Sequence, residues 1–437
     1  MATTTNNIRS LQVRVAAEHI QAARLKRWPF AFNFYSIATN AVDSLLLVFA
    51  SALGAGVGLV AMIEALGDLL SAVAPFGIGK IVDKTNSPRK YLVIVFAAAA
   101  TLMIAFAITS SPMVLLALCI GWGVVFVSAG PMVPIVLTRL FRRSEWATQQ
   151  SRLSSMNSLG TAMGFGICVL WLFVGGDLVG EANSIRVLFV LGAILCGFAT
   201  VFALLWLRPA DQHRHQHAAL PPSAPPQGER LAPGSPLRKS AVVMTAGKKK
   251  TIYTDGLKNL FFTTMVLFFG IGIMGGIYPA YMSQELGAEV YKVVIGSTVF
   301  NLAAGLAMPH VAHNMGKMMP ARLHALGSLG RSGAFLAIGV VGLILSGTPA
   351  HLAVIGLMAF SGLTWAATAT AGGNRLVYLA PTGQKGTVSG HFTAFSFMAL
   401  AAGAIVGGQV AGFFGYFPAF AIASICAFIA SILAIRL

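Results

Sequence analysis

A stripe of polar side chains runs through the first long apolar stretch of the sequence. Asn33, Ser36, Asn40 and Asp43 follow one another at intervals of three, four and three residues, so they share one face of a helix. Asn and Ser side chains hydrogen-bond solutes, and a carboxylate in an apolar helix is costly unless it faces a cavity or a partner. The stripe therefore predicts a helix that presents a binding face, with Asp43 near its middle.

The next apolar stretch carries a second acidic pattern. Glu64 and Asp68 are four residues apart, which places them on the same helical face. Neighbouring carboxylates in apolar surroundings suit the binding of a proton or a cation. Asp43, Glu64 and Asp68 are thus our candidates for proton or cation handling. The alternative, in which these acids only hydrogen-bond neighbouring helices or Glu64 reaches the outer surface, stays open.

The acidic residues stop early in the chain, because no Asp or Glu follows Glu289. Any cation chemistry is therefore expected in the first half. Arg331 lies in an apolar stretch and has no acidic partner from its own half. It could attract an anionic group, but the favoured interpretation is that its long side chain reaches the membrane surface.

Metal and catalytic chemistry receive less support. His213, His215 and His217 alternate in a Pro-rich segment and could converge on a transition metal, although a solvated linker is the favoured interpretation. No GxSxG, HExxH or Walker pattern occurs, so neither an enzyme nor a cofactor is expected. The cysteines lie in apolar stretches without CxxC spacing, which indicates buried and inert thiols: they are Cys119, Cys168, Cys196 and Cys426.

Membrane-spanning helices must position these residues. The chain has 437 residues, of which 56% are hydrophobic and 10% charged, whereas soluble domains carry about 25% charged residues. A span needs roughly 20 apolar residues. The sequence predicts two sets of six spans, near 29–51, 56–79, 91–110, 113–138, 149–174 and 185–207, then near 259–282, 289–312, 321–346, 350–376, 388–413 and 415–435.

Basic residues divide the loops into two classes. Loops on one side contain Lys80, Lys84, Arg89 and Lys90, then Arg139, Arg142, Arg143 and Arg152, then Lys317 and Arg322, then Arg375 and Lys385. Loops on the other side contain only Arg186 and Lys292. Basic loops stay in the cytoplasm, so both termini are expected on the cytoplasmic side. The membrane is best interpreted as a bacterial inner membrane. The net charge of +17 does not indicate nucleic-acid binding, because the basic residues flank spans without interleaved aromatic residues.

The chain accordingly divides into four parts. We expect a cytoplasmic tail over 1–28, a six-helix bundle over 29–207, a Pro-rich cytoplasmic linker over 208–257 and a second bundle over 258–437. Small-residue stripes, which allow close helix contact, occur in the fifth span at Gly160 and in the eleventh at Gly403. The matching position of the stripes indicates that the halves are related.

The loop after the second span carries a motif. Gly79, Asp83, Lys84, Arg89 and Lys90 form the order Gly, three residues, Asp, a basic residue, a turn and a basic pair. This pattern resembles the signature loop of the major facilitator superfamily, although Asn86 replaces the turn glycine and Ser87-Pro88 lengthen the turn. The resemblance implies that the Asp latches one conformation by binding a helix N-terminus. A carboxylate is stabilised there by the helix dipole, and we expect the receiving end near Thr387.

The resemblance also implies a fold and a function. It implies an all-α membrane protein of twelve transmembrane helices in two pseudo-symmetric six-helix bundles, which transports a small solute by alternating access and works as a monomer. Spans one, four, seven, eight, ten and eleven would then line a central cavity. The expected cavity residues are Asn33, Ser36, Asn40, Asp43, Tyr278, Ser361, Thr364, Trp365, Thr368 and His391.

Two family features are missing. The fourth span lacks the Arg associated with proton coupling, and no Pro follows Gly164 in the fifth span as it does in antiporters. H⁺ therefore stays only a candidate coupling ion. Two alternatives to a small-solute carrier remain: a transporter of iron, manganese or zinc on the same fold, and a membrane scaffold or receptor that transports nothing.

Overall fold

The computed structural model describes residues 28–55, 57–84, 87–141, 143–207, 253–315 and 318–435. Most of the predicted tail and linker, including His213, His215 and His217, lie outside these residues. The backbones of Asp43, Glu64 and Asp68 are described, but their side chains are not.

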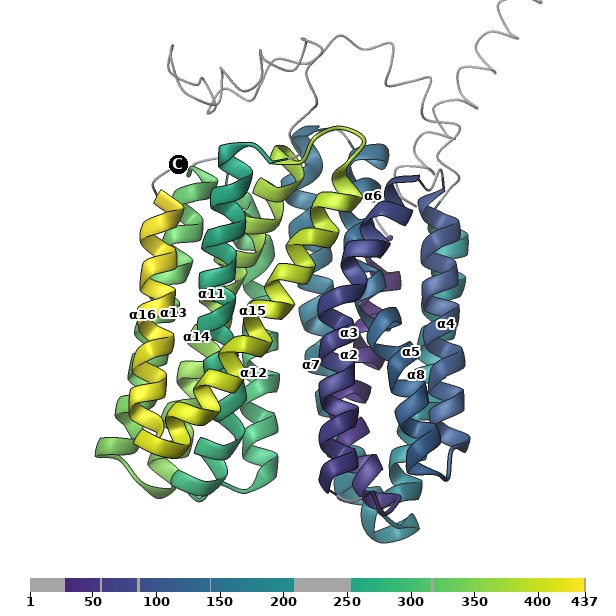
Figure 1. Cartoon of the computed structure of the whole chain (residues 1–437), viewed down its shortest axis with the longest axis vertical. Coiled ribbons are helices and arrows are strands. Elements are labelled where there is room, and N and C mark those ends of the chain that lie inside the picture. Colours follow the sequence, from purple (N-terminus) through teal and green to yellow (C-terminus); the bar gives the residue numbers. More distant parts are fainter. Residues whose placement is uncertain are drawn as a thin grey trace, which may run out of the picture.

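The described chain forms two helical bundles, as predicted (Figure 1). The N-terminal bundle consists of α2 (Pro29–Ala52), α3 (Val57–Lys84), α4 (Pro88–Ile108), α5 (Pro112–Ser128), η1 (Gly130–Met132), α6 (Val133–Leu140), η2 (Arg143–Glu145), α7 (Trp146–Val179) and α8 (Glu181–Trp206). The C-terminal bundle consists of α11 (Asp255–Ala280), η6 (Tyr281–Glu285), α12 (Val290–Asn314), α13 (Pro320–Ile344), α14 (Gly347–Leu379), α15 (Lys385–Phe414) and α16 (Tyr416–Ile435).

Proline and glycine set several helix ends. Pro88 begins α4 directly after Ser87, whose side chain accepts a hydrogen bond from the Lys90 amide at 3.5 Å. Proline suits the first helical position because its fixed φ is preorganised and its missing N–H has no helical partner there. Gly180 and Gly415, with φ of 83° and 87°, separate consecutive long helices, in a left-handed conformation that glycine adopts without steric cost.

The two bundles use the same helix pairings. In the N-terminal bundle α2 packs on α7, α4 on α8 and α3 on α5; in the C-terminal bundle α11 packs on α15, α13 on α16 and α12 on α14. The glycine stripes mediate one equivalent pair in each bundle. A Cβ on Gly160 of α7 would lie 2.7 Å from the Asn33 carbonyl oxygen of α2, and a Cβ on Gly403 of α15 only 2.1 Å from that of Phe269 on α11. The predicted pseudo-symmetry is therefore present in the packing.

Two predicted spans are interrupted. The fourth span breaks between α5 and α6, where Gly130 and Pro131 form a single 3-10 turn, because proline cannot donate its helical hydrogen bond. The seventh span contains Pro279 near the end of α11 and continues as the π-helix Tyr281–Glu285. The long hydrophobic stretches were visible in the sequence, whereas these local changes of helix type were not predicted.

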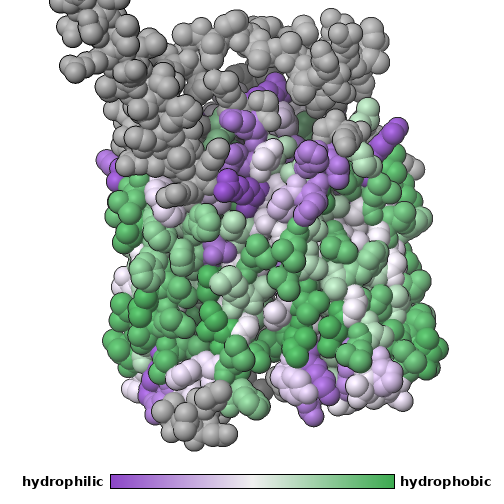
Figure 2. All heavy atoms as spheres, turned by 180° about the vertical axis from the view of Figure 1, so that it is seen from behind, coloured by the Kyte–Doolittle hydropathy of each residue, from purple (hydrophilic) through white to green (hydrophobic). Residues whose placement is uncertain are grey.

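The outer surface matches a bilayer. Eleven stretches of the described residues are long and apolar enough to cross a membrane, and α3, with 28 residues, is a further long helix. Figure 2 shows a broad hydrophobic band around the middle of the visible face, with hydrophilic residues gathered toward both ends. Exposed apolar side chains such as Phe173 and Ile108, 83% and 79% exposed, therefore face lipid rather than water.

Candidate functional site

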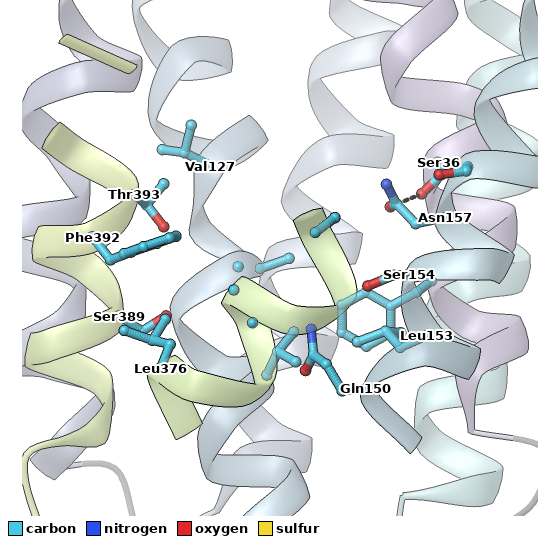
Figure 3. A pocket seen from close by; sticks show the side chains of 18 of the residues that line it. Ser36, Val127, Gln150, Leu153, Ser154, Asn157, Leu376, Ser389, Phe392 and Thr393 are labelled. Atoms are coloured by element: carbon cyan, nitrogen blue, oxygen red, sulfur yellow. Dashed lines mark hydrogen bonds between the residues drawn. The ribbon is translucent and has the colours of Figure 1, made fainter. Parts of the chain in front are cut away.

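A cavity of about 430 Å³ lies between the two bundles. Its wall comes from α2, α5, η1, α6 and α7 on one side and from α11, α12, α13, α14 and α15 on the other. In Figure 3, Ser389, Phe392 and Thr393 of α15 lie on one side of this space, and Gln150 and Ser154 of α7 lie on the other. The polar lining residues are Ser36, Thr39, Asn40, Gln150, Ser154, Asn157, Ser158, Thr264, His324, Thr368, Ser389 and Thr393.

The structure brings together four of the predicted cavity residues. Ser36 and Asn40 of α2 line the N-terminal side, and Trp365 and Thr368 of α14 line the C-terminal side. Ser36 hydrogen-bonds Asn157 of α7, as the dashed line in Figure 3 marks. The cavity wall thus combines hydroxyl and amide groups with aromatic rings, which suits a small organic solute.

Five other predicted residues lie outside the cavity wall: Asn33, Tyr278, Ser361, Thr364 and His391. Most of them hydrogen-bond residues of other helices or segments, because intramembrane polar groups need hydrogen-bond partners. The Asn33 amide donates to the Met156 carbonyl oxygen at 2.7 Å, and the Tyr278 hydroxyl donates to that of Val293 at 3.3 Å. The placement of these five residues is therefore a correction to the predicted cavity.

Ser361 and Thr364 belong to the packed interior of the C-terminal bundle. The Thr364 hydroxyl donates to the Ser361 carbonyl oxygen at 2.8 Å. His391 lies nearer the start of α15, where it hydrogen-bonds Tyr253 and packs on Phe76 of α3 at 5.2 Å between ring centroids. It is therefore part of the contact between bundles rather than of the cavity.

Arg331 does not reach the membrane surface, so the favoured sequence interpretation of this residue is wrong. It is 2% exposed in the interior of α13, and its guanidinium donates to the Ser361 carbonyl oxygen at 3.0 Å. The guanidinium carbon lies 4.9 Å from the centre of the Trp365 ring and 5.6 Å from that of Phe300. These cation–π contacts stabilise the buried charge.

Several cavity residues were missed in the sequence. Gln150, Ser154, Asn157 and Thr161 recur on α7 at intervals of four, three and four residues, and all but Thr161 line the cavity. This spacing is the same kind of signal that drew attention to α2. Ser389 and Thr393 of α15 are four residues apart and so also share a helical face, whereas His324 of α13 stands alone and only the packing reveals it.

One end of the molecule holds the bundles together. We name this the basic end: it carries the end of α3, the start of α4, the segment between α6 and α7, and the segment between α14 and α15. Asp83, at the end of α3, accepts hydrogen bonds from the Gly386 and Thr387 amides at 2.7 Å each and from the Thr387 hydroxyl at 2.5 Å. These groups form the start of α15, so the carboxylate lies where the helix dipole favours negative charge.

Glycines allow α3 and α15 to approach at this point. A Cβ on Gly79 would lie 2.5 Å from the Gly386 carbonyl oxygen, and a Cβ on Gly390 would lie 2.2 Å from that of Pro75. Any side chain at these positions would therefore push the helices apart. Figure 1 shows α15 leaning from its own bundle toward α3 at the top of the view.

A cation–aromatic cluster joins the bundles beside this crossing. Lys385 of α15 places its ammonium 4.4 Å from the centre of the Trp146 ring of α7 and donates to the Val377 carbonyl oxygen at 3.2 Å. The Tyr378 hydroxyl of α14 donates to the Arg143 carbonyl oxygen at 3.0 Å. The Lys385–Trp146 and Tyr378–Arg143 contacts link segments more than 200 residues apart in the chain.

Two further hydrogen bonds between the bundles also lie in the half of the molecule near the basic end. Ser151 and Ser155 of α7 donate to the Met308 and Gly305 carbonyl oxygens of α12 at 2.5 and 2.6 Å. Among described side chains no ion pair involves Asp83: the two that are present join Lys258 to Asp255 and Lys292 to Glu289. The start of α15 therefore binds the Asp83 carboxylate, near Thr387 as the sequence predicts. Lys84 and Lys90 are exposed.

Comparisons with known proteins address the family. A family model described as Major Facilitator Superfamily matches residues 30–254, slightly more than half of the chain. No curated protein matches the sequence. The crystal structure of the human organic anion transporter MFSD10 (TETRAN) has a TM-score of 0.68 and 17% identity, covering 95% of this chain and 99% of its own. The crystal structure of the E. coli fucose:proton symporter, FucP, has a TM-score of 0.67 and 13% identity, covering 95% of this chain and 98% of its own.

At these identities the two structures show the fold, and the family match spans the whole N-terminal bundle with its signature loop. The chain therefore belongs to the major facilitator superfamily.

Proposed function

We propose that this protein carries a small organic solute across the membrane by alternating access. The observation that carries the proposal is the cavity between the bundles. The hydrogen bonds that join the two bundles lie toward one end of the molecule, beside this cavity. Rocking of one bundle against the other would expose this cavity to each face of the membrane in turn. The chain belongs to a family of transporters, which supports this mechanism.

The basic end is proposed to face the cytoplasm. Loops rich in Lys and Arg stay on the cytoplasmic side during insertion, and Lys80, Lys84, Arg89 and Lys90 all lie at this end. With the basic end held closed, the present arrangement corresponds to the outward-facing state. A bacterial inner membrane and a monomer remain our proposals for location and assembly.

Asp83 is proposed to act as the latch of this state. Its three hydrogen bonds to Gly386 and Thr387 must break when the bundles separate at the basic end. Gly79 supports the latch by allowing the close approach. Lys84, Arg89 and Lys90 are proposed to contribute positive charge around it rather than a direct ion pair.

The chemical nature of the solute is constrained by the cavity wall. Hydroxyl and amide groups from α2 and α7 face aromatic rings such as Phe268, Phe392 and Trp365, an arrangement that suits an organic compound with polar groups at one side. The two structural neighbours are named for an organic anion and for fucose with a proton, so the fold itself does not select a solute. Asp43, Glu64 and Asp68 remain the candidates for coupling to H⁺ or another cation.

A thermal-stability screen of the purified protein tests the proposal. The panel contains sugars, organic acids, amphipathic cations, and Fe²⁺, Mn²⁺ and Zn²⁺, and ligand binding raises the melting midpoint by mass action. We expect an organic compound to give a concentration-dependent rise that is lost in Gln150→Ala. Gln149→Ala is the matched control, because Gln149 lies within hydrogen-bonding distance of Trp28 at 3.5 Å, inside the N-terminal bundle.

Counterflow in proteoliposomes then measures movement of the same compound. Loss of counterflow in Gln150→Ala but not in Gln149→Ala would support transport through the cavity. A metal ion as the only hit would favour the metal-transporter alternative, and the absence of both binding and counterflow would favour a scaffold or receptor.

A further inference from the structure

The C-terminal bundle contains buried positive charge without acidic partners. Arg331 and Arg375 are 2% and 8% exposed, and no Asp or Glu follows Glu289 in the chain. The ion pairs among described side chains, Lys258–Asp255 and Lys292–Glu289, involve neither arginine. A buried charge is unfavourable unless it is paired or hydrogen-bonded. Arg331 is hydrogen-bonded to the Ser361 carbonyl oxygen and packs on aromatic rings, so Arg375 is the arginine that would gain most from a negative partner.

His324 places an unpartnered group in the cavity wall itself. Its side chain lines the cavity and the residue is 2% exposed. Neither ring nitrogen has a hydrogen-bond partner among the described residues. The ring lies against Gly372 of α14, where a Cβ would be 3.5 Å from the His324 Cε1 atom. Most buried polar groups in proteins are hydrogen-bonded, so this imidazole is positioned for a partner that occupies the cavity.

Arg375 lies near this histidine. It follows Gly372 by three residues on α14, so it lies about one turn along the same helical face from the glycine that the His324 ring contacts. Its Nη1 atom is buried without a hydrogen-bond partner in the described part of the chain. His324 thus provides a buried donor next to the cavity, and Arg375 provides positive charge close to it.

The rest of the wall completes an asymmetric site. Arg331 is seven residues beyond His324 on α13, which is about 10.5 Å further along the same helical face. Its guanidinium packs on the Trp365 ring, and that ring lines the cavity. Gln150, Ser154 and Asn157 on the opposing α7 wall are neutral. Among the described residues, positive charge therefore lies next to the C-terminal side of the wall, whereas the lining residues of α7 are neutral.

We propose that the cavity binds an organic anion. Its carboxylate, or an equivalent oxyanion, accepts a hydrogen bond from His324 and is attracted by Arg375, while its uncharged part rests between Trp365 and the α7 wall. This inference rests on the proposed transport function and names the class of solute. A neutral amide of the same shape could still accept a hydrogen bond from the imidazole, but it would leave the charge of Arg375 unpaired, so the site favours an acid over its amide.

Paired probes test the charge requirement on the full-length protein. The melting midpoint is measured with nicotinate against nicotinamide, benzoate against benzamide and lactate against glycerol, at constant ionic strength set with chloride. We expect only the acids to raise the midpoint. In Arg375→Gln and in His324→Leu the apparent affinity for the acid should fall on the order of tenfold or more, the effect of losing one charge-assisted interaction.

Control variants separate binding from folding. Arg322→Gln removes the same charge from an exposed position near the start of α13 and should leave the acid-dependent rise intact, and Arg375→Lys should retain part of it. Without ligand, Arg375→Gln should melt no lower than the wild type, because it removes an unpaired buried charge. If Arg375 were only structural, the ligand-free variant would melt lower and the acid-dependent rise would persist.

The result also distinguishes this inference from the transport proposal. Equal stabilisation by an acid and its neutral partner, or no stabilisation by any acid of the panel, would overturn the anion site. Counterflow of a neutral compound in proteoliposomes would then leave the transport function standing. Counterflow of nicotinate, benzoate or lactate that is abolished by Arg375→Gln and unchanged by Arg322→Gln would support both.

Discussion

Replacing Asp83 by asparagine should shift the protein away from the arrangement described above. The carboxylate accepts three hydrogen bonds from the start of α15, at 2.7, 2.7 and 2.5 Å, and these bonds exist only while the basic end is closed. An asparagine side chain keeps one accepting oxygen, so its NH₂ group would face an amide donor. Asp83→Asn therefore removes at least one charge-assisted hydrogen bond and the favourable interaction with the helix dipole.

The magnitude follows from these two losses. A hydrogen bond to a charged group contributes about 1.5–3 kcal/mol, and a charge at a helix N-terminus about 0.3–1 kcal/mol. Together they amount to about 2–4 kcal/mol, which changes an equilibrium constant by roughly 30- to 700-fold. A shift of this size is enough to populate the state with an open basic end when the two states differ by only a few kcal/mol. Transport should fall strongly while folding is preserved.

Spin-label distances in nanodiscs measure this shift. Lys90, at the start of α4, and Met319, just before α13, are both exposed at the basic end and belong to different bundles. With labels on cysteines at these two sites and the four native cysteines replaced, Asp83→Asn should transfer population to longer distances. Asp255→Asn is the matched control, since Asp255 is exposed in the first turn of α11. Unchanged distances in an Asp83→Asn protein that melts normally would refute the latch.

Further substitutions test the same contacts and the packing behind them. Gly79→Ala should lengthen the spin-label distance, because its Cβ would lie 2.5 Å from the Gly386 oxygen. Gly408→Ala on α15 is the control and should not lengthen it, because no atom lies within 4 Å of that Cβ position. Equal distances in the two variants would contradict the close approach of α3 and α15. Lys385→Met removes the cation–π contact with Trp146, worth about 0.5–2 kcal/mol, and should give a smaller shift in the same direction, with Lys258→Met as the exposed control. Gly403→Ala should lower the melting midpoint by overpacking against Phe269 at a cost of about 1–3 kcal/mol, while Gly412→Ala, which has open space, should melt like the wild type.

Hydropathy and charge were sufficient to predict the fold. The apolar stretches and the Pro and Gly residues between them are local signals, so the two bundles could be predicted without knowledge of packing. The contact of Asp83 with the start of α15 could also be predicted, because the resemblance to the family's signature loop implies that this Asp binds a helix N-terminus, where the helix dipole stabilises a carboxylate. The structure places the contact at Thr387, the position that the sequence suggested.

The cavity wall was harder to predict from the sequence, because helical periodicity does not show which residues of a polar stripe contact a neighbouring helix. Asn33 and Asn40 belong to the same stripe on α2, yet the first bonds the α7 backbone and the second lines the cavity. Arg331 illustrates a second limit. Three aromatic rings surround its guanidinium, and they come from α12, α13 and α14, so only the tertiary structure reveals how the charge is accommodated.

Accessibility of the cavity from each membrane face tests the alternating-access account most directly. Ser154 lines the cavity and is half-buried, so Ser154→Cys can be labelled with a membrane-impermeant maleimide in right-side-out and in inverted vesicles, in a background without other cysteines. The account predicts labelling mainly from outside when the latch is intact, and a gain of labelling from the cytoplasmic face in Asp83→Asn. Labelling from the same single face, at the same rate, in both proteins would contradict alternating access.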